Sequence, residues 1–295
     1  MSSSSHSRPE HSAPPELFYG RDEAAKYRSN GRMMAIQTSM AQRALELLML
    51  PDDRPCLILD VGCGTGLSGD VLTEAGHQWV GMDISRDMLE IAVEDTEGHV
   101  CQTDMGQGVP FRPGVFDACI SVSALQWLCN ADRSSHNPVQ RLRRFFQTLF
   151  NSLTDNARAV FQIYPENPAQ LDLISSTAMR CGFNGGVLVD FPHSTKARKY
   201  FLVIYTGRPP AEVPVPLTDE HAASSYTQAD FGRQRGAKLS ATALQEKHRS
   251  NRKGKRAPLK SKQWILDKKS RQRRQGKEVR PDSKFTGRSR RRFAQ

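Results

Sequence analysis

The sequence predicts an α/β fold organised around an open, mostly parallel β-sheet. An apolar run over 56–59 stops at Asp60 and enters a loop with glycines at positions 62, 64 and 66. Asp83 and Asp104 lie where two further strands are expected to end, and segments with helical periodicity separate the strands. Polar residues that follow successive parallel strands meet at one edge of the sheet, where such sheets bind ligands. The fold class therefore also predicts where a site should lie.

The individual elements follow from the spacing of apolar residues and from the residues that interrupt it. Apolar residues recur every three to four positions from Glu16 to Leu48, which predicts a helical region that Pro51 ends. Gly76 is expected to stop the helix after the glycine loop, and Ser85 to cap the next one. In order, we expect a strand to position 60, helix 67–75, strand 79–83, helix 88–94, strand 115–122, helix 138–153, strand 159–164, helix 168–181, and an antiparallel pair of 186–191 with 200–206.

The helix expected over 138–153 carries leucine and phenylalanine residues on one side and arginines largely on the other. The arginines are Arg141, Arg143 and Arg144. Charged residues opposite the apolar side of an amphipathic helix normally face water. We therefore expect these three side chains to be solvated.

The glycine loop suits a ligand that approaches the backbone closely, because glycine adopts dihedral angles closed to other residues and carries no side chain. Two ligand classes compete for it. Counted from Gly62 the spacing is GxGxG, as in enzymes that use S-adenosylmethionine, while 64–69 also reads GxGxxG, the dinucleotide fingerprint. The strand-end acids, with Asp60 before the glycines, favour S-adenosylmethionine. A nicotinamide enzyme and a degenerate fold that binds nothing are the alternatives.

Contacts with this cofactor are expected at the ends of the first four strands. Asp83 would grip the ribose hydroxyls and Asp104 would lie at the adenine. Tyr19, Lys26 and Tyr27, which precede the first strand, are candidates for a cover over the pocket, although core packing explains Tyr27 equally well. The candidate cofactor-binding residues are Tyr27, Asp60, Gly62, Cys63, Gly64, Gly66, Asp83, Ile84, Asp104, Met105 and Ser121.

The segment after the fourth strand, 123–130, is expected to face the methyl acceptor. It lacks the Asn-Pro-Pro-Tyr or Asp-Pro-Pro-Tyr motif that accompanies methylation of exocyclic base nitrogens, and the Pro-Cys motif for carbon-five of pyrimidines. It offers Gln126, Trp127 and Asn130, an aromatic face with amide groups. This suits a ring nitrogen with a free lone pair, such as guanine N7, from which no proton need be removed. We predict that these residues position the substrate and that none acts as a base; core packing is the competing explanation for Trp127.

Charge is distributed unevenly along the chain. Residues 231–295 hold 23 of the 42 Lys and Arg but only 4 of the 31 Asp and Glu, so the first 230 residues are net acidic. A basic tail on an acidic body predicts a polyanionic partner. We expect a disordered N-terminus over 1–15, a globular domain over 16–206, a proline-marked linker over 207–237 and a basic region for RNA binding and nuclear targeting over 238–295.

Cysteine usage and the start of the chain bear on the compartment. The six cysteines have no metal-ligand spacing, so we expect reduced thiols and no metal site. Residues 1–15 lack the apolar core of a signal peptide, and no run is long enough for a membrane helix. These features favour the cytosol or the nucleus and no membrane partner.

Several segments together resemble the eukaryotic small-subunit ribosomal RNA guanine-N7 methyltransferases. They are PEH (9–11), PPELFY (14–19), LDVGCGTGLSG (59–69), DMGQG (104–108), QWLCNA (126–131), YPEN (164–167), RRQGKEVRPD (273–282) and FTGR (285–288). The resemblance covers nearly the whole chain and is weakest over 207–258. It implies a class I S-adenosylmethionine-dependent methyltransferase with a mostly parallel, seven-stranded sheet, which methylates one guanine of 18S rRNA during maturation of the small ribosomal subunit.

The resemblance also implies partners and a location. The partners are pre-rRNA within a small-subunit precursor and a small zinc-binding activator subunit that several methyltransferases share. The location is the nucleus, in nucleolus and nucleoplasm, with the cytoplasm as a further compartment. Two other classes of function stay open. One is an assembly protein that binds pre-rRNA and for which methylation is incidental; the other is a small-molecule methyltransferase, which leaves the basic tail unexplained.

Overall fold

The structure is a computed structural model that describes residues 8–51, 53–133, 136–195, 197–208, 214–218 and 269. The chain divides into two units, Met1–Phe231 and Gly232–Gln295. The basic region expected over 238–295 lies outside the described residues, except for Lys269.

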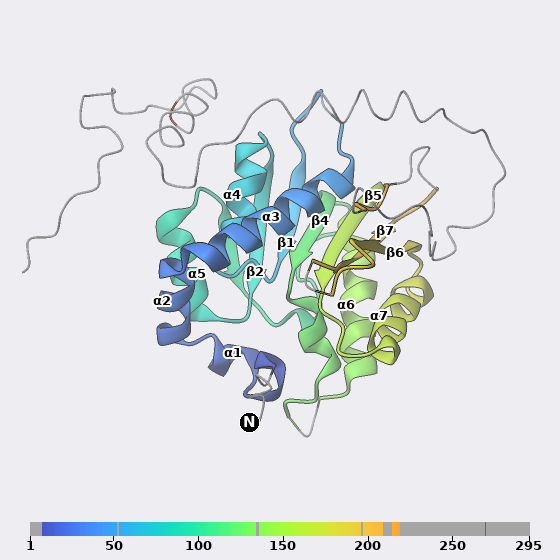
Figure 1. The fold of residues 1–295 in the computed structure, drawn as a ribbon. Helices are drawn as coiled ribbons and strands as arrows, with labels where there is room; N and C mark the ends of the chain where they lie inside the picture. Colours follow the sequence, from blue (N-terminus) through green and yellow to red (C-terminus); the bar gives the residue numbers. More distant parts are fainter. Residues whose placement is uncertain are drawn as a thin grey trace, which may run out of the picture. The chain divides into compact units, whose positions relative to one another are not determined.

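A seven-stranded sheet forms the centre of the first unit, with the strand order β3-β2-β1-β4-β5-β7-β6 (Figure 1). Strands β1 to β5 are parallel, and β7 lies antiparallel between β5 and β6. This is the class I arrangement that the resemblance implied. The strands are β1 (Leu57–Val61), β2 (Gln78–Asp83), β3 (His99–Gln102), β4 (Phe116–Val122), β5 (Leu153–Ile163), β6 (Asn184–Asp190) and β7 (Lys199–Tyr205).

Helices cover both faces of the sheet. Helices α3, α4 and α5 pack on one face, and α6 and α7 on the other (Figure 1). The helices are α1 (Pro15–Phe18), α2 (Arg21–Ser29), α3 (Gly31–Leu48), α4 (Leu67–Glu74), α5 (Arg86–Asp95), α6 (Pro138–Ser152) and α7 (Pro168–Arg180), with 3-10 helices η1 (Pro9–His11), η2 (Met105–Gln107) and η3 (Leu125–Cys129). Within the described ranges, no helix has both the length and the apolar character needed to span a membrane.

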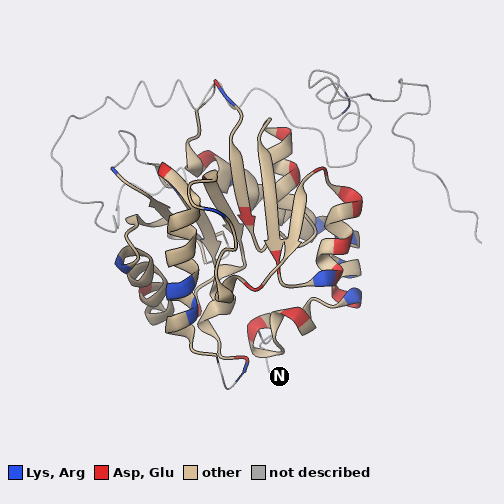
Figure 2. Cartoon of the chain, turned by 180° about the vertical axis from the view of Figure 1, so that it is seen from behind, with Lys and Arg blue, Asp and Glu red and all other residues tan. Residues whose placement is uncertain are grey.

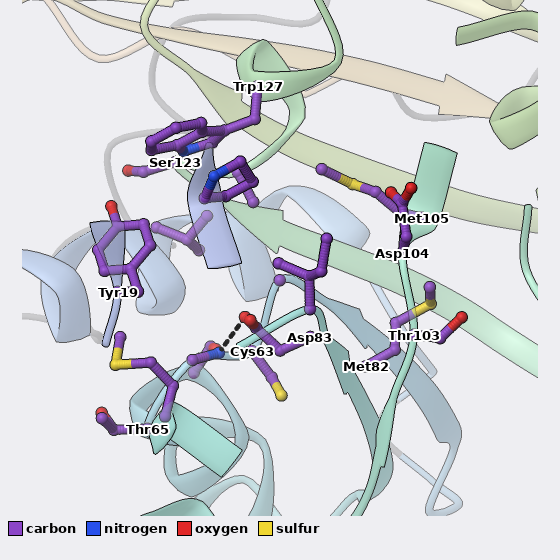
Figure 3. A pocket seen from close by; sticks show the side chains of 18 of the residues that line it. Tyr19, Cys63, Thr65, Met82, Asp83, Thr103, Asp104, Met105, Ser123 and Trp127 are labelled. Carbon is purple, nitrogen blue, oxygen red and sulfur yellow. Dashed lines mark hydrogen bonds between the residues drawn. The ribbon is translucent and has the colours of Figure 1, made fainter. Parts of the chain in front are cut away.

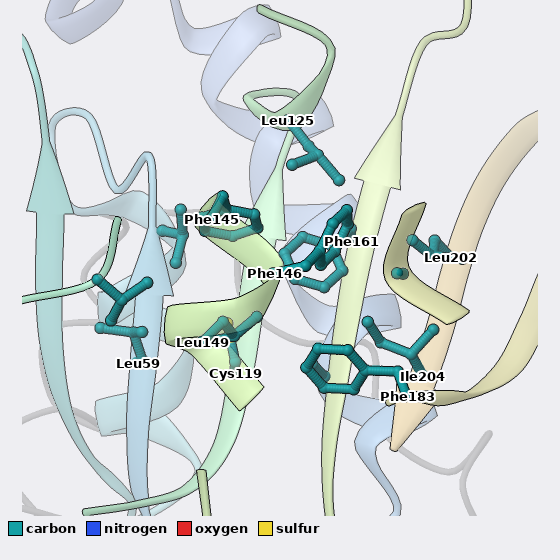
Figure 4. Packing of buried hydrophobic residues seen from close by; sticks show 14 of the residues in the cluster. Leu59, Cys119, Leu125, Phe145, Phe146, Leu149, Phe161, Phe183, Leu202 and Ile204 are labelled. Atoms are coloured by element: carbon teal, nitrogen blue, oxygen red, sulfur yellow. The ribbon is translucent and has the colours of Figure 1, made fainter. Parts of the chain in front are cut away.

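Two apolar clusters fill the space between the sheet and its helix layers. Because side chains alternate along a strand, β1 sends Leu59 into one cluster and Ile58 into the other. In the first cluster, Phe145 and Phe146 of α6 contact Phe161 of β5 edge-on, each with ring centroids 5.9 Å apart (Figure 4). All three rings are fully buried, so they fix α6 against the sheet.

Capping explains where several helices begin. The expected N-terminal helical region is three helices, because Gly20 and Asn30 interrupt it. The side chain of Asn30 caps α3 by accepting a hydrogen bond from the Met33 amide at 3.1 Å. Ser85 caps α5, as predicted, by accepting a hydrogen bond from the Met88 amide at 3.2 Å.

Two expectations do not hold. Strand β5 begins at Leu153 and not at position 159, because Leu153 already pairs with Phe116 of β4. The N-terminus is not disordered over residues 8–15, where η1 forms. There, the Arg8 guanidinium donates hydrogen bonds to the carbonyl oxygens of Tyr164 (2.9 Å) and Pro165 (3.2 Å). Both differences come from contacts between distant segments, which local periodicity does not record.

Residues 214–218, which fall inside the expected linker, lie against the end of β6. Asp190 is 1% exposed there and accepts hydrogen bonds from the Arg43 guanidinium of α3, at 2.8 and 3.2 Å, and from the Leu217 amide, at 2.7 Å. Arg43 also donates to the Val215 carbonyl at 2.7 Å. One buried carboxylate therefore joins α3, β6 and the segment that follows the sheet.

We expect Asp190→Ala to lower the free energy of unfolding by about 3 kcal/mol, because it leaves the largely buried Arg43 guanidinium without its main counter-charge. Urea unfolding of the full chain measures the change. Glu46→Ala is the matched control, since Glu46 is the exposed second partner of Arg43; its expected cost is below about 1 kcal/mol. Equal losses in the two variants would contradict the role given to Asp190.

Candidate functional site

A pocket lies at the carboxyl ends of β1, β2 and β4, at the sheet edge where the sequence predicts a site (Figure 3). Strand order reverses between β1 and β4, so the chain leaves these neighbours toward opposite faces of the sheet. The glycine loop, the segment after β3 and the turn after β4 line the pocket. Pro15, Tyr19 and Tyr27 from the N-terminal segment and Gln37 of α3 complete the wall.

The glycine loop follows β1, and its backbone takes a conformation that residues with side chains seldom adopt. Gly62, Gly64 and Gly66 have φ angles of +70°, +52° and +81°, in the left-handed region that glycine adopts most readily. The Gly62 amide donates a hydrogen bond to the Met82 carbonyl at 2.7 Å, which fastens the loop to β2. A Cβ at position 62 would lie 2.3 Å from the Cβ of Ala124. Only glycine fits there.

Asp83, at the end of β2, lines the pocket and also holds the loop. Its Oδ2 accepts a hydrogen bond from the Gly64 amide at 2.9 Å, and its Oδ1 accepts one from the Ser85 amide at 2.8 Å. Burial raises the pKa of this carboxyl, and the backbone hydrogen bonds act in the opposite direction. A carboxylate can accept about four hydrogen bonds, so Asp83 can still accept one from a hydroxyl of a ligand.

Asp60 lies behind the loop and is not among the residues that line the pocket. It is fully buried; Oδ2 accepts a hydrogen bond from the Ser68 hydroxyl at 2.6 Å, and Oδ1 has no partner within the described part of the chain. Burial raises the pKa of Asp60 to about 7 despite the hydrogen bond from Ser68, which lowers it. Ser68 does line the pocket, so its hydroxyl stands between Asp60 and a ligand.

Asp104 and Met105 lie on the side of the pocket away from Tyr19 (Figure 3). Asp104 caps η2 by accepting a hydrogen bond from the Gly106 amide at 2.8 Å, and it forms an ion pair with Arg141 of α6 at 2.7 Å. Arg141 is buried and lines the pocket, so the expectation that it faces water is wrong. The cause is η2, which packs against the start of α6 and covers this position. Arg143 and Arg144 are exposed, as expected.

The turn after β4 has a strained backbone. Ser123 has a φ of +58°, which residues other than glycine seldom adopt. Its hydroxyl donates to Oε1 of the buried Gln162 at 2.7 Å, and its carbonyl accepts from Nε2 of Gln126 at 2.9 Å. Gln126 is itself buried and does not line the pocket, nor does Asn130. Within this turn, Gln126 supports the backbone of Ser123.

Trp127 belongs to an aromatic wall that spans two distant parts of the chain (Figure 3). Its ring lies 5.7 Å from that of Tyr19 and 6.1 Å from that of Phe18, and Tyr19 lies 5.7 Å from Tyr27. The Ser85 hydroxyl donates to the Tyr19 carbonyl at 2.6 Å and holds the N-terminal segment in place. Burial raises the pKa of both tyrosine phenols, so the wall is uncharged at neutral pH.

The pocket brings together most of the predicted residues but not all. Those that line it are Tyr19, Tyr27, Gly62, Cys63, Gly64, Asp83, Ile84, Asp104, Met105 and Trp127. Those that do not are Asp60, Gly66, Ser121, Gln126 and Asn130. Lys26, a candidate for the cover, is exposed and pairs with Glu23 instead. The predicted residues outside the pocket lie beside residues that line it. They can therefore affect a ligand only through those neighbours.

Sequence reasoning missed several lining residues. They include Gln37, Thr65, Ser68, Met82, Met88, Thr103, Ser123 and Arg141. Thr65, Met82, Thr103 and Ser123 sit one or two positions from predicted residues in the sequence, so a wider window around each strand end would have found them. Arg141 lies one turn before Phe145, so helical spacing brings it closer to the apolar side than Arg144; its charge grouped it with the exposed arginines.

These features fit S-adenosylmethionine. Asp83 and Asp104 offer carboxylate acceptors at two strand ends, suited to ribose hydroxyls and to an adenine amino group. Ile84 and Met105 follow them directly and provide apolar surface for a flat base. Gly62 and Gly64 border the same space with a backbone that carries no side chain.

The raised pKa of Asp60 predicts a pH dependence of stability. A carboxyl whose pKa is higher in the folded than in the unfolded protein takes up a proton on folding, so the free energy of unfolding falls as pH rises from about 4 to about 7. Asp60→Asn cannot ionise, and we expect a smaller fall, with the raised pKa of Asp83 sustaining part of it. Urea unfolding without ligand across this range measures the slope. Asp22→Asn, at an exposed position of α2, is the control; a slope unchanged by Asp60→Asn would refute the prediction.

Comparison with known proteins gives matches along the whole chain. A family profile described as "Methyltransferase domain" matches residues 58–149. A second, described as "Methyltransferase involved in Williams-Beuren syndrome", matches residues 204–292 and so includes the stretch where the resemblance seemed weakest.

Full-length relatives share a single description. The chain is 52% identical to the 18S rRNA (guanine-N(7))-methyltransferase of Mus musculus over 96% of each chain. It is 51% identical to the probable 18S rRNA (guanine-N(7))-methyltransferase of Dictyostelium discoideum, over 96% of this chain and 98% of that one. It is 46% identical to the 18S rRNA (guanine(1575)-N(7))-methyltransferase of Saccharomyces cerevisiae, over 97% and 98%. The chain therefore belongs to the family of 18S rRNA (guanine-N7)-methyltransferases, which are S-adenosylmethionine-dependent enzymes of class I fold.

Proposed function

We propose that this protein transfers a methyl group from S-adenosylmethionine to N7 of one guanine in 18S rRNA during maturation of the small ribosomal subunit. The observation that carries the proposal is full-length similarity to enzymes named for this reaction. The chemistry of the pocket supports it. Among the described residues that line the pocket there is no Glu, His or Lys, and the two Asp residues, Asp83 and Asp104, lie where we place the cofactor. Guanine N7 has a free lone pair and needs no base.

We assign each part of the cofactor to a group in the pocket. Asp83 accepts hydrogen bonds from the ribose hydroxyls, and Asp104 accepts one from the adenine amino group. Ile84 and Met105 enclose the adenine ring, and the backbone at Cys63 and Gly64 borders the amino-acid portion, with Tyr27 opposite. Asp60 acts through the Ser68 hydroxyl. Gly66 and Ser121 shape the loop and the strand behind these contacts.

When bound, S-adenosylmethionine supplies an electrophilic methyl group on its sulfonium. The protein's own part is to align the acceptor nitrogen with that group and to exclude water, since displacement at carbon is in line. In our proposal Trp127 and Tyr19, whose rings contact each other edge-on, offer an aromatic surface against which the guanine packs. Gln126 contributes by fixing the backbone of Ser123. Asn130 lies at the end of η3 and positions the substrate from outside the pocket wall.

The composition of the exposed face of α6 favours RNA as the substrate. No Asp or Glu occurs between positions 133 and 154, although the first 230 residues are net acidic. Spacing places Gln140, Arg143, Arg144, Gln147 and Asn151 on one face of α6, and all five are exposed. Figure 2 shows the basic positions of this helix. Hydrogen-bond donors without nearby acids suit the phosphates of RNA.

We further propose that a small zinc-binding activator subunit forms a heterodimer with this chain. The family resemblance is the main support. Strand β3 is an edge strand of the sheet, with one side unpaired among the described residues, and such an edge invites a covering partner. We also propose that the protein works in the nucleus, in the nucleolus and nucleoplasm, and in the cytoplasm as a further compartment, because the proposed substrate matures there.

A second candidate function is that of a pre-rRNA-binding assembly factor for which methylation is dispensable. Binding a cofactor does not require a basic tail, so the charge of residues 231–295 favours a role in binding RNA. A small-molecule methyltransferase would leave the tail without a role. The two RNA-based functions differ in whether the cofactor site is needed.

Asp83→Lys tests the cofactor assignment. It removes a ribose acceptor and places a positive charge beside a sulfonium ligand, so we expect binding of S-adenosylhomocysteine and S-adenosylmethionine to fall below detection in calorimetry. The unchanged protein should bind both and should not bind NAD. Asp22→Lys makes the same charge change on exposed α2 and should bind normally. Binding of NAD without a response to S-adenosylhomocysteine would overturn the assignment.

The same variant separates the enzyme from the assembly factor. In cells that carry only Asp83→Lys, reverse-transcription mapping should find no N7-methylguanine at the target in 18S rRNA. Normal yield of small subunits in those cells makes binding the essential role, and reduced yield makes methylation essential. If no N7-methylguanine depends on the unchanged protein, the substrate assignment is wrong.

Replacing both Arg143 and Arg144 by Gln should weaken binding to an 18S rRNA fragment and reduce its salt dependence. Two lost phosphate contacts correspond to a decrease of about 1.5 in the slope of log affinity against log salt. Filter binding by the full chain across salt concentrations measures the slope. Arg28→Gln with Arg86→Gln is the matched control, because both arginines already pair with acids on α5. An equal change in the two double variants would argue against a specific role for α6.

A further inference from the structure

Arg141 differs from the two other arginines of α6, Arg143 and Arg144, in being buried. Its side chain is only 9% exposed, and it lines the cofactor pocket although it belongs to the helix that follows β4. Its Nη2 lies 2.7 Å from Oδ1 of Asp104, its Nη1 lies 3.3 Å from Nδ1 of His136, and its Nε has no partner among the described residues. A buried cation in this position needs a reason, because desolvation makes it costly.

The two carboxylate oxygens of Asp104 accept different numbers of hydrogen bonds. Oδ1 accepts both the Gly106 amide, at 2.8 Å, and Nη2 of Arg141, at 2.7 Å. Those two bonds occupy the lone pairs of Oδ1. Oδ2 accepts no hydrogen bond from the described residues. These two bonds therefore fix the rotation of the carboxylate group, and Oδ2 stays free to accept a hydrogen bond from a ligand.

The backbone of η2 is shaped to admit the guanidinium. A Cβ at Gly106 would lie 2.2 Å from Nε of Arg141, so any larger residue would displace the side chain. Two turns farther along α6, the Thr148 hydroxyl accepts a hydrogen bond from the Val109 amide at 2.8 Å. Helix α6 and the segment after β3 are thus fastened at two points, and the ion pair is the one that reaches the pocket.

We propose that Arg141 is a positioning residue that orients Asp104 so that its single free oxygen reads the amino group of the cofactor's adenine. The proposal rests on the cofactor placement given above. An adenine amino group donates a hydrogen bond to Oδ2. Hypoxanthine carries a carbonyl oxygen at the same position, and a fixed carboxylate repels it. Arg141 itself does not contact the reacting atoms; it acts through Asp104.

The test compares two ligands, S-adenosylhomocysteine and S-inosylhomocysteine, by calorimetry with the full chain. The unchanged protein should prefer the adenosyl compound by roughly tenfold or more, since the discriminating hydrogen bond involves a charged group. In Arg141→Gln the carboxylate loses its fixed orientation, so the preference should fall to within about threefold. Arg180→Gln, which removes an arginine at an exposed position of α7 outside the pocket lining, should keep the original preference.

Two further variants keep the test informative if Arg141→Gln does not fold. Gly106→Ala displaces the guanidinium without removing its charge and should also reduce the preference, while Arg141→Lys restores a cation and should recover part of it. Thermal melting of each variant reports folding separately. If either Arg141→Gln or Gly106→Ala folds, the comparison can be made.

The outcomes distinguish this proposal from the assignment of the cofactor. Equal losses of affinity for both ligands, with the ratio unchanged, would make Arg141 merely structural and overturn the proposal. Equal binding of both ligands by the unchanged protein would overturn it too, while the cofactor assignment would stand. Failure to bind either ligand would refute the cofactor assignment and the proposal together.

Discussion

The site depends on the close approach of two backbones, at Gly62 after β1 and Ala124 after β4. A Cβ at position 62 would lie 2.3 Å from that of Ala124, so the two turns meet only because one of them has no side chain. Strands β1 and β4 are neighbours whose following helices lie on opposite faces of the sheet. The chain must therefore diverge at this point, and the divergence opens the space that the pocket occupies. The other features of the site, from the left-handed glycines to the strained Ser123, accommodate this geometry.

The parts of the fold that the sequence predicted correctly depend on local signals. Ser85 caps α5 three residues before the amide it binds, and the sheet with its strand-end acids follows from apolar runs and glycines close to them. The parts it did not predict depend on contacts between distant residues. Arg141 lies one turn before Phe145, at the border of the apolar side of α6, and it is buried because η2 approaches the helix there. Ser123 takes its conformation with help from Gln162, 39 positions away.

The position of Asp60 illustrates a related limit. Its place at the end of a strand and before the glycines identifies it as important, yet it turns toward α4 and Ser68, behind the loop. Sequence spacing indicates which strand end a residue occupies, but the direction of its side chain relative to the pocket follows from the pleat of β1. Ile58 on the same strand packs into the cluster that includes Leu72 of α4, which places the alternate positions of β1 on that side of the sheet.

Ser85 uses one hydroxyl for two tasks. Its oxygen accepts the Met88 amide at the start of α5, and its proton goes to the carbonyl of Tyr19 in the N-terminal wall. Its amide, in turn, is bound by Asp83. The positions of the start of α5, of the Asp83 carboxylate and of Tyr19 are therefore coupled, because Ser85 bonds to all three. A ligand that stabilises the arrangement at Asp83 therefore also stabilises the position of Tyr19, and by reciprocity an ordered Tyr19 raises affinity for that ligand.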